Sequence, residues 1–226
     1  MERFVVRVWL PDRPGALGAV ASRIGAVRGD VVGIDILERG AGRAIDELVV
    51  ELPDATLVGL LVSEIDQVDG VDVENVRPAR DRLHDPRLDA LETAAAMVAA
   101  TSPSTLLPVL VARARLDFET EWSAIVDVDD RLLLASDGAP PPPAWLIAFV
   151  GGSRSSAAVT AGECGPDDIA WAGLAGGRLA LVLGRCGRPF RARERRQLAA
   201  VARIADHRHT ALTGASRPAL AEPTPA

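Results

Sequence analysis

The chain has 226 residues, of which 48% are hydrophobic and 25% charged, and its formal net charge is −6. This apolar content excludes wholesale disorder, and the length suits two small domains or one of ordinary size. All 25 basic residues are arginine and tyrosine is absent, which excludes a P-loop lysine, a Schiff-base lysine, a kinase β3 lysine and phenolic acid/base chemistry.

The charge and hydropathy patterns also limit the partners. An acidic body argues against a broad nucleic-acid or membrane-surface interface, which needs a positive field. The sequence contains no apolar run of 18 residues, and no signal peptide precedes Phe4. We therefore expect a soluble cytoplasmic protein that contacts neither nucleic acid nor membrane.

The first predicted strand, residues 4–10, leads through a Pro/Gly turn into an amphipathic helix. Pro14 fixes its own φ, and Gly15 has no side chain where the first unpaired N–H groups of the helix point outward. Such a helix start favours a small anion, for instance a carboxylate. The apolar residues of this helix recur at helical spacing at Leu17, Val20, Ala21, Ile24 and Val27.

The next elements complete a ferredoxin-like order. Strands are predicted at residues 31–38 and 43–52, then a helix, then a strand at residues 71–76. The apolar stripe of that second helix is Leu57, Leu60, Leu61, Ile65 and Val68. The resulting order is strand, helix, strand, strand, helix, strand. With Asp12-Arg13-Pro14-Gly15-Ala16-Leu17 in the first turn, residues 3–77 resemble the ACT domain, a regulatory module that typically binds amino acids; we assign it residues 1–78.

The ACT resemblance implies a ligand site at the first turn. Asp12 would meet the ammonium of an amino acid, and backbone N–H groups of residues 15–17 would meet its carboxylate. The alternative for Asp12 is a turn residue that caps nearby N–H groups, and the alternative for residues 15–17 is that they only start the helix. Where amino-acid-binding members often place an asparagine, this chain has valines, so a domain that only dimerises stays open. The predicted ligand-binding residues are Asp12, Pro14, Gly15, Ala16, Leu17, Val31 and Val32.

Alternation along the first strand divides its side chains between two faces. Val6, Val8 and Leu10 are predicted to face the helices, as are Val32, Ile34 and Ile36 on the second strand. An exposed Trp9 and Val5 on the other face suggest that a second copy or the following domain packs there. The ACT resemblance favours a homodimer, with a predicted interface of Val5, Arg7 and Trp9.

Residues 79–103 are predicted as a helical linker. Asp85-Pro86 can start a helix, because aspartate is a good N-cap and proline is tolerated at the first helical position. We interpret this helix as inter-domain packing. Its predicted apolar stripe is Leu88, Leu91, Ala95, Val98 and Ala99.

The second half is predicted to be another α/β domain with a central antiparallel sheet, so the chain as a whole belongs to the α+β class. Its predicted elements are a helix capped by Ser104, a hairpin of residues 122–128 and 131–136, a proline spacer at 139–143, a strand at 145–150, a loop at 151–156, a strand at 179–183 and a helix at 193–209. The Gly-Gly-Ser segment of that loop could alternatively cradle a phosphate. The apolar face of the last helix is Leu198, Val201, Ala202, Ile204 and Ala205.

A second resemblance covers residues 104–210. The segment from Leu179 to Arg185, followed by Pro189-Phe190 and a helix that begins around Glu194, resembles a GAF domain. GAF domains bind small molecules or simply dimerise, and no cyclic-nucleotide or chromophore motif stands out here. Residues 211–226 are predicted to be disordered.

The cysteines, the histidines and the clustered arginines are interpreted as structural residues. Cys164 and Cys186 are expected to be small buried residues, with a redox pair as the alternative. Neither they nor the histidines suggest a metal site. A cluster of arginines is expected to form a solvated face, the alternatives being an acidic partner or nucleic acid. Its members are Arg185, Arg188, Arg191, Arg193, Arg195 and Arg196.

No catalytic signature is present, so we expect neither an enzyme nor a cofactor. The sequence predicts a cytoplasmic, homodimeric regulatory protein that senses a small-molecule effector, above all an amino acid, and passes the change to an unidentified protein partner. The alternative is a ligand-free dimerisation and scaffold protein that acts through its basic closing helix.

Overall fold

The computed structural model describes residues 1–79, 86–156 and 166–215. The chain divides into two compact units, Met1–His84 with Arg191–Arg193 and Asp85–Phe190 with Glu194–Ala226. Each unit contains a four-stranded antiparallel sheet. Among the helices of the described segments, none is both long and apolar enough to cross a bilayer.

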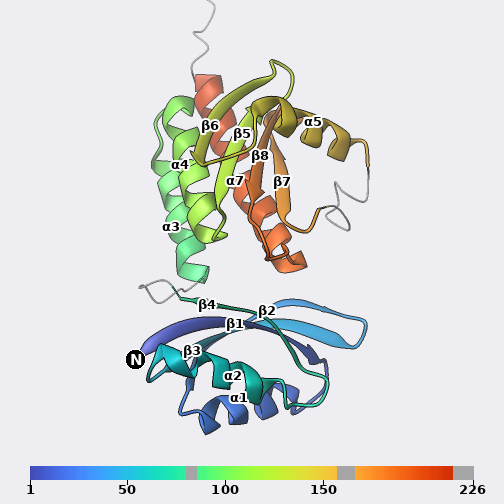
Figure 1. Cartoon of the computed structure of the whole chain (residues 1–226). Coiled ribbons are helices and arrows are strands. Elements are labelled where there is room, and N and C mark those ends of the chain that lie inside the picture. The colour runs from blue at the N-terminus through green and yellow to red at the C-terminus, as the bar shows by residue number, and fades with distance from the viewer. Residues whose placement is uncertain (80–85, 157–165, 216–226) are drawn as a thin grey trace, which may run out of the picture. The chain divides into compact units, whose positions relative to one another are not determined.

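The first unit has the predicted order of elements. These are β1 (Glu2–Pro11), α1 (Ala16–Ala26), β2 (Asp30–Gly40), β3 (Arg43–Leu52), the 3-10 turn η1 (Ala55–Leu57), α2 (Val58–Ile65) and β4 (Asp72–Pro78). The sheet order is β2-β3-β1-β4, and α1 and α2 cover one face of the sheet (Figure 1). Val6, Val8 and Leu10 lie in the core beneath these helices, as predicted.

The edge strand β2 departs from the expected burial. Ile34 pairs with Leu48 and Ile36 with Asp46, so both face the helix side as predicted, yet both are exposed because β2 lies at the edge of the sheet. Two bulges interrupt the register, one at Val32 and one at Leu37. A bulge shifts the alternation of side chains between the two faces. Val32, at the first bulge, is exposed, although alternation predicted that it faces the helices.

On the other face of this sheet, Val5 is buried. In the sheet register Val5 lies between Val49 and Arg77 on the two neighbouring strands. Arg7 is buried as well, and Trp9 is half-buried. The predicted role of these three residues in a dimer interface stays a prediction.

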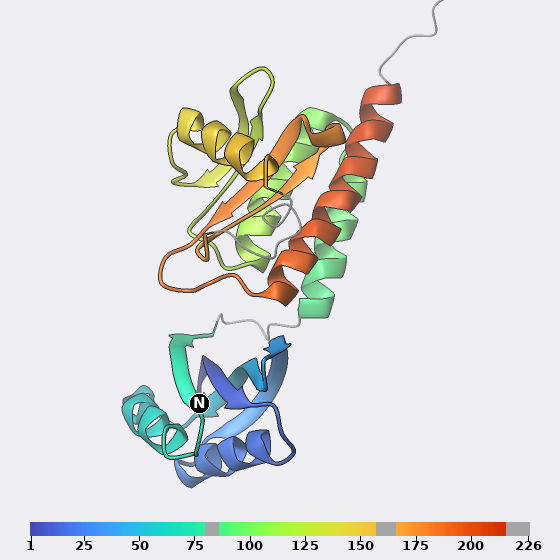
Figure 2. The ribbon, with the colours of Figure 1, turned by 90° about the vertical axis from the view of Figure 1, so that its right-hand side faces the viewer.

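In its described residues, the second unit has four helices packed on a sheet of order β6-β5-β8-β7. Its described elements are α3 (Pro86–Ala99), α4 (Pro103–Asp117), β5 (Trp122–Asp127), β6 (Leu132–Gly138), α5 (Pro143–Arg154), β7 (Ile169–Leu174), η2 (Ala175–Gly177), β8 (Leu179–Gly184) and α7 (Ala192–Ala215). One core lies between the sheet and α3, α4 and α7, and a smaller core lies under α5 on the opposite face (Figure 2). The hairpin β5–β6, the strand β8 and the closing helix confirm the predicted elements.

The predicted strand at residues 145–150 is wrong, because this segment belongs to α5. Pro143 stands in the first helical turn, and Leu146, Ile147 and Val150 are buried at helical spacing. The predicted loop that followed begins inside the same helix, with Ser153 buried in its last turn. The strand β7 was not predicted.

The predictions for α3 and α4, on the other side of the sheet, are also corrected by the structure. The N-cap of α4 is Ser102, not Ser104, and Ser102 forms a capping box with Thr105. The α3 segment, expected as a linker, contributes Met97 and Ala100 to the core of the second unit. The stripe predicted for α3 is instead turned outward, with Leu88, Leu91 and Val98 exposed.

In α7, the predicted buried residues Leu198, Val201, Ala202 and Ala205 are confirmed, whereas Ile204 is exposed. This helix continues to Ala215, so the predicted disordered tail begins too early. Residues 216–226 and Cys164 lie outside the described residues.

Candidate functional site

The turn between β1 and α1 is held by backbone hydrogen bonds. The Asp12 N–H donates to the Gly42 carbonyl over 2.9 Å, and the Ala16 N–H donates to the Arg13 carbonyl over 3.3 Å. Gly15 is the N-cap of α1 with φ at +88°, in the left-handed region that glycine adopts without strain. The sequence Pro14-Gly15 therefore sets the point where the helix begins.

The first turn of α1 keeps unused hydrogen-bond donors. No side chain caps this helix, and its first turn contains no acidic residue. The Ala19 N–H bonds to the Gly15 carbonyl, while the N–H groups of Leu17 and Gly18 have no hydrogen-bond partner within the described segments. A Cβ atom placed on Gly15 would meet no heavy atom within 4 Å. These two donors, at the positive end of the helix dipole, suit an anionic group.

A buried carboxylate belongs to the same region. Asp46 on β3 pairs in register with Val8 and Ile36, and it shares the helix-facing side of the sheet with its neighbours Ala44 and Leu48. Only 4% of Asp46 is exposed, and its Oδ1 atom is buried without a hydrogen-bond partner among the described residues. A buried acceptor without a partner costs free energy, so Asp46 is a group that a ligand donor would satisfy.

Electrostatics link Asp46 to the turn. Burial raises the pKa of Asp46, the positive charge of Arg39 opposes this rise, and the negative charge of Asp12 adds to it. Arg39 also forms an ion pair with Asp12, with 3.7 Å between Nε and Oδ1. Asp12, Arg39 and Asp46 therefore form one charge cluster, which lies next to α1 because Asp12 is four residues before Ala16.

The sequence analysis missed Asp46. A signal was present, because Asp46 is the one charged residue in the alternating series Ala44, Asp46, Leu48, Val50 and Leu52, whose other members lie in the core. A charge at such a position indicates a buried polar group that needs a partner.

The structure does not bring Val31 and Val32 to this turn. Val31 pairs with Val50, which pairs with Phe4 near the start of β1, whereas Asp12 follows the end of that strand at Pro11. Seven residues of extended strand separate the two places, which is roughly 23 Å at 3.3 Å per residue. Within one copy of the chain, the two predicted halves of the site are therefore at opposite ends of the sheet.

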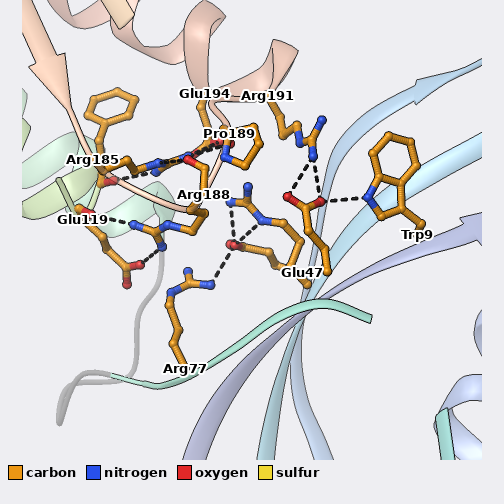
Figure 3. A network of polar contacts seen from close by, with 12 residues as sticks. Trp9, Glu47, Arg77, Glu119, Arg185, Arg188, Pro189, Arg191 and Glu194 are labelled. Carbon is orange, nitrogen blue, oxygen red and sulfur yellow. Dashed lines mark hydrogen bonds and ion pairs between the residues drawn. The ribbon is translucent and has the colours of Figure 1, made fainter. Parts of the chain in front are cut away.

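The residues of the predicted dimer face have polar partners within the first unit. The Arg7 guanidinium donates to Glu47 Oε1 through Nε at 2.9 Å and Nη2 at 2.8 Å, and Arg77 Nη1 donates to the same atom at 3.0 Å (Figure 3). Burial acts to raise the pKa of Glu47, but Arg77 and Arg7 outweigh it and lower the pKa overall. Trp9 Nε1 donates to Glu74 over 2.8 Å. These contacts fix the side chains of this face.

The arginine cluster predicted as a solvated face is partly buried, so that prediction is wrong for Arg185 and Arg188. Arg185 donates to the carbonyls of Phe118, Arg188 and Pro189 over 2.8 to 2.9 Å. It also pairs with Glu194 at the start of α7, and Arg188 pairs with Glu119 (Figure 3). These contacts tie the segment after β8 to the ends of α4 and α7, which is a structural role.

Cys186 also differs from its prediction, because it is exposed rather than buried. The negative charge of Glu121 raises the pKa of the Cys186 thiol, and partial desolvation adds to the effect. A raised pKa lowers the fraction of reactive thiolate.

A hollow of about 500 Å³ lies at the far end of the first sheet from the α1 turn. Its charged lining residues include Arg3 and Glu51, which form an ion pair at 2.6 Å. Since these charges already neutralise each other, the α1 turn is the better candidate for binding a charged ligand.

Comparisons with known proteins give likenesses of structure only. No family model matches the chain, and no curated protein matches it. Among solved structures, the ACT domain of GTP pyrophosphokinase from Chlorobium tepidum is 15% identical, covering 34% of this chain and 97% of that one, with a TM-score of 0.28. An ACT domain protein from Streptococcus pneumoniae is 16% identical over 37% of this chain and 98% of that one, with a TM-score of 0.30.

A protein of unknown function from Galdieria sulphuraria is similar over a longer stretch. It is 15% identical and covers 91% of this chain and 92% of its own, with a TM-score of 0.32. The ACT domains thus correspond to about a third of the chain, and the GAF-like character of the second half stays a prediction.

Proposed function

We propose that this protein is a non-catalytic regulator that binds a small zwitterion, above all an amino acid, at the first turn of α1. The observation that carries the proposal is the Oδ1 atom of Asp46, which is buried without a hydrogen-bond partner among the described residues and whose carboxylate feels the charge of Asp12 in the turn before α1. The N–H donors of α1 and the Asp46 acceptor lack partners among the described residues, and a zwitterion carries one group that suits each of them.

The proposal assigns each group a role. The N–H groups of Leu17 and Gly18 hold the ligand carboxylate, and Asp46 with Asp12 accepts hydrogen bonds from the ammonium. Ala16 is not a donor in this scheme, because its N–H already bonds to Arg13. Gly15 leaves open space through which the ligand approaches the backbone.

Ligand binding would act by population shift, favouring one packing of a homodimer and so changing what a protein partner meets. The ACT resemblance of the first turn supports this reading, and the cytoplasm is the location we propose. Val31 and Val32 would join the site only if a second copy placed its β2 next to the α1 turn.

The proposal predicts a response to amino acids in a thermal-shift panel of the whole chain with the common amino acids and nucleotides. A ligand at about 100 times its dissociation constant stabilises the native state by roughly 2.7 kcal/mol. We expect one or two amino acids to raise the melting temperature by several degrees and nucleotides to leave it unchanged.

The matched variants are Gly15→Val and Gly176→Val. Both glycines have positive φ and open space at the Cβ position, so both substitutions strain the backbone to a similar degree. Only Gly15→Val places a side chain over the proposed site, so only this variant should lose the response. If no amino acid shifts the wild-type chain, the proposal fails and the ligand-free scaffold is favoured.

A further inference from the structure

Helix α3 has apolar side chains on two opposite faces. Thr93, Met97 and Ala100 are buried on the face that packs into the second unit. On the opposite face, Leu88, Leu91 and Val98 are 52%, 68% and 58% exposed, and Ala95 between them is exposed too. A helix at the surface of a protein normally presents polar residues on its outer side, so this stripe needs an explanation.

The spacing of the stripe indicates what covers it. Its four members follow one another at intervals of three, four and three residues. This is the a/d spacing of a coiled-coil seam, in which each side chain fits between residues of a facing helix. No charged residue interrupts the stripe, and Glu92 beside it is paired with Arg113 of α4 at 3.7 Å. The fitting partner is therefore another helix with an apolar seam.

The stripe is complementary to itself under two-fold rotation. When two copies of α3 run antiparallel, the large Leu91 of each copy lies opposite the small Ala95 of the other, and Leu88 lies opposite Val98. A two-fold interface requires this reciprocity, in which residue i meets residue j and j meets i. We propose that α3 pairs antiparallel with α3 of a second copy of this chain.

The length of the helix sets the expected strength. The 14 residues of α3 span about 21 Å, so a helix pair buries less than the roughly 1,200 Å² at which stable interfaces begin. The dimer is therefore reversible and depends on concentration. This surface is separate from the Val5, Arg7 and Trp9 face predicted from the sequence.

Sedimentation velocity on the whole chain, from about 1 µM to about 200 µM, tests the proposal in the range of weak self-association. The wild-type chain should show a growing dimer fraction, and Leu91→Glu should raise the dimer dissociation constant about tenfold or more. Leu132→Glu is the control, because Leu132 on β6 is 55% exposed and outside the stripe. It should dimerise like the wild type, as should Trp9→Arg.

A wild-type chain that stays monomeric throughout would overturn the proposal. So would a Leu91→Glu variant that dimerises as the wild type does, or a dimer that only Trp9→Arg disrupts. The melting temperature of Leu91→Glu at the lowest concentration should equal that of the wild type, because the substituted position is at the surface.

Disulfide trapping tests the direction of pairing. In a background with Cys164→Ser and Cys186→Ser, a chain carrying Leu91→Cys is mixed with one carrying Ala95→Cys. Antiparallel pairing predicts efficient cross-links between the two different chains. A Leu91→Cys chain that cross-links best with itself would indicate parallel helices and overturn the antiparallel arrangement.

Discussion

Asp46 is a residue that reduces the stability of the fold and to which we assign a role in the proposed site. Its carboxylate sits among core residues of the first unit, and its Oδ1 has no partner in the described chain. Burial raises its pKa, which means that the folded state disfavours the charged form. Sites that bind ligands often retain such unfavourable groups, because the ligand supplies the missing partner.

The raised pKa leads to a prediction for Asp46→Asn. A carboxyl whose pKa is higher in the folded state destabilises that state when it is ionised, and the effect disappears as the pH falls below both pKa values. We expect Asp46→Asn to stabilise the first unit at pH 7 by about 1 kcal/mol, a common size for a single substitution. The gain should shrink as the pH approaches the usual aspartate pKa of about 4.

Hydrogen exchange of the β1 and β3 amides in the wild type and the variant measures this difference within the first unit. A gain that grows on acidification would contradict the assigned sign of the pKa shift.

At the residue scale, sequence reasoning found the groups whose role is local. Gly15 was expected to permit a special backbone conformation, and its φ of +88° agrees. Arg185 was misjudged in part because one of its partners, the Phe118 carbonyl, is 67 residues away in the sequence. Long arginine side chains reach backbone groups that only the folded chain brings near.

At the scale of elements, periodicity predicted the first unit almost completely. β3 spans the same residues that were predicted, whereas α5 was predicted as a strand. A short apolar run such as residues 145–150 fits either a strand or a buried helix, so its periodicity decides little. The proline at the start of α5 was the better signal, because it is favoured in the first turn of a helix.

The capping of α4 gives a prediction at this scale. The Ser102 side chain accepts a hydrogen bond from the Thr105 N–H, and loss of such a cap costs about 1 kcal/mol. Ser102→Ala should therefore speed hydrogen exchange in α4. Ser104→Ala is the control: the Ser104 hydroxyl contacts the Ser102 hydroxyl over 2.9 Å, but the cap bond to the Thr105 N–H comes from Ser102, so this variant should change exchange less than Ser102→Ala. Equal effects of the two variants would show that Ser102 is not the cap.

At the scale of the whole molecule, two α+β units share one chain, and each offers a different kind of surface. In the described residues, the first unit has a buried carboxylate oxygen of Asp46 without a hydrogen-bond partner and a start of α1 without a side-chain cap, and the second unit has the exposed stripe of α3. Regulation by a ligand requires two distinct sites that influence each other, and we propose that these two surfaces are such sites. Composition alone excluded several enzyme classes, but it could not indicate these surfaces, since both depend on which side chains the folded chain buries and which it leaves exposed.

The most direct test of the claim that Asp46 holds an amino acid is calorimetric titration of the whole chain with the amino acid that raises the melting temperature in the thermal-shift panel. Wild type, Asp46→Asn and Asp30→Asn are compared, Asp30 being an exposed carboxylate at the far end of the sheet. Loss of a charged hydrogen-bond acceptor costs about 1.5 to 3 kcal/mol, so Asp46→Asn should bind at least about tenfold more weakly while Asp30→Asn binds like the wild type. Equal affinities for all three chains would contradict the account, because Asp46 would then take no part in holding the ligand.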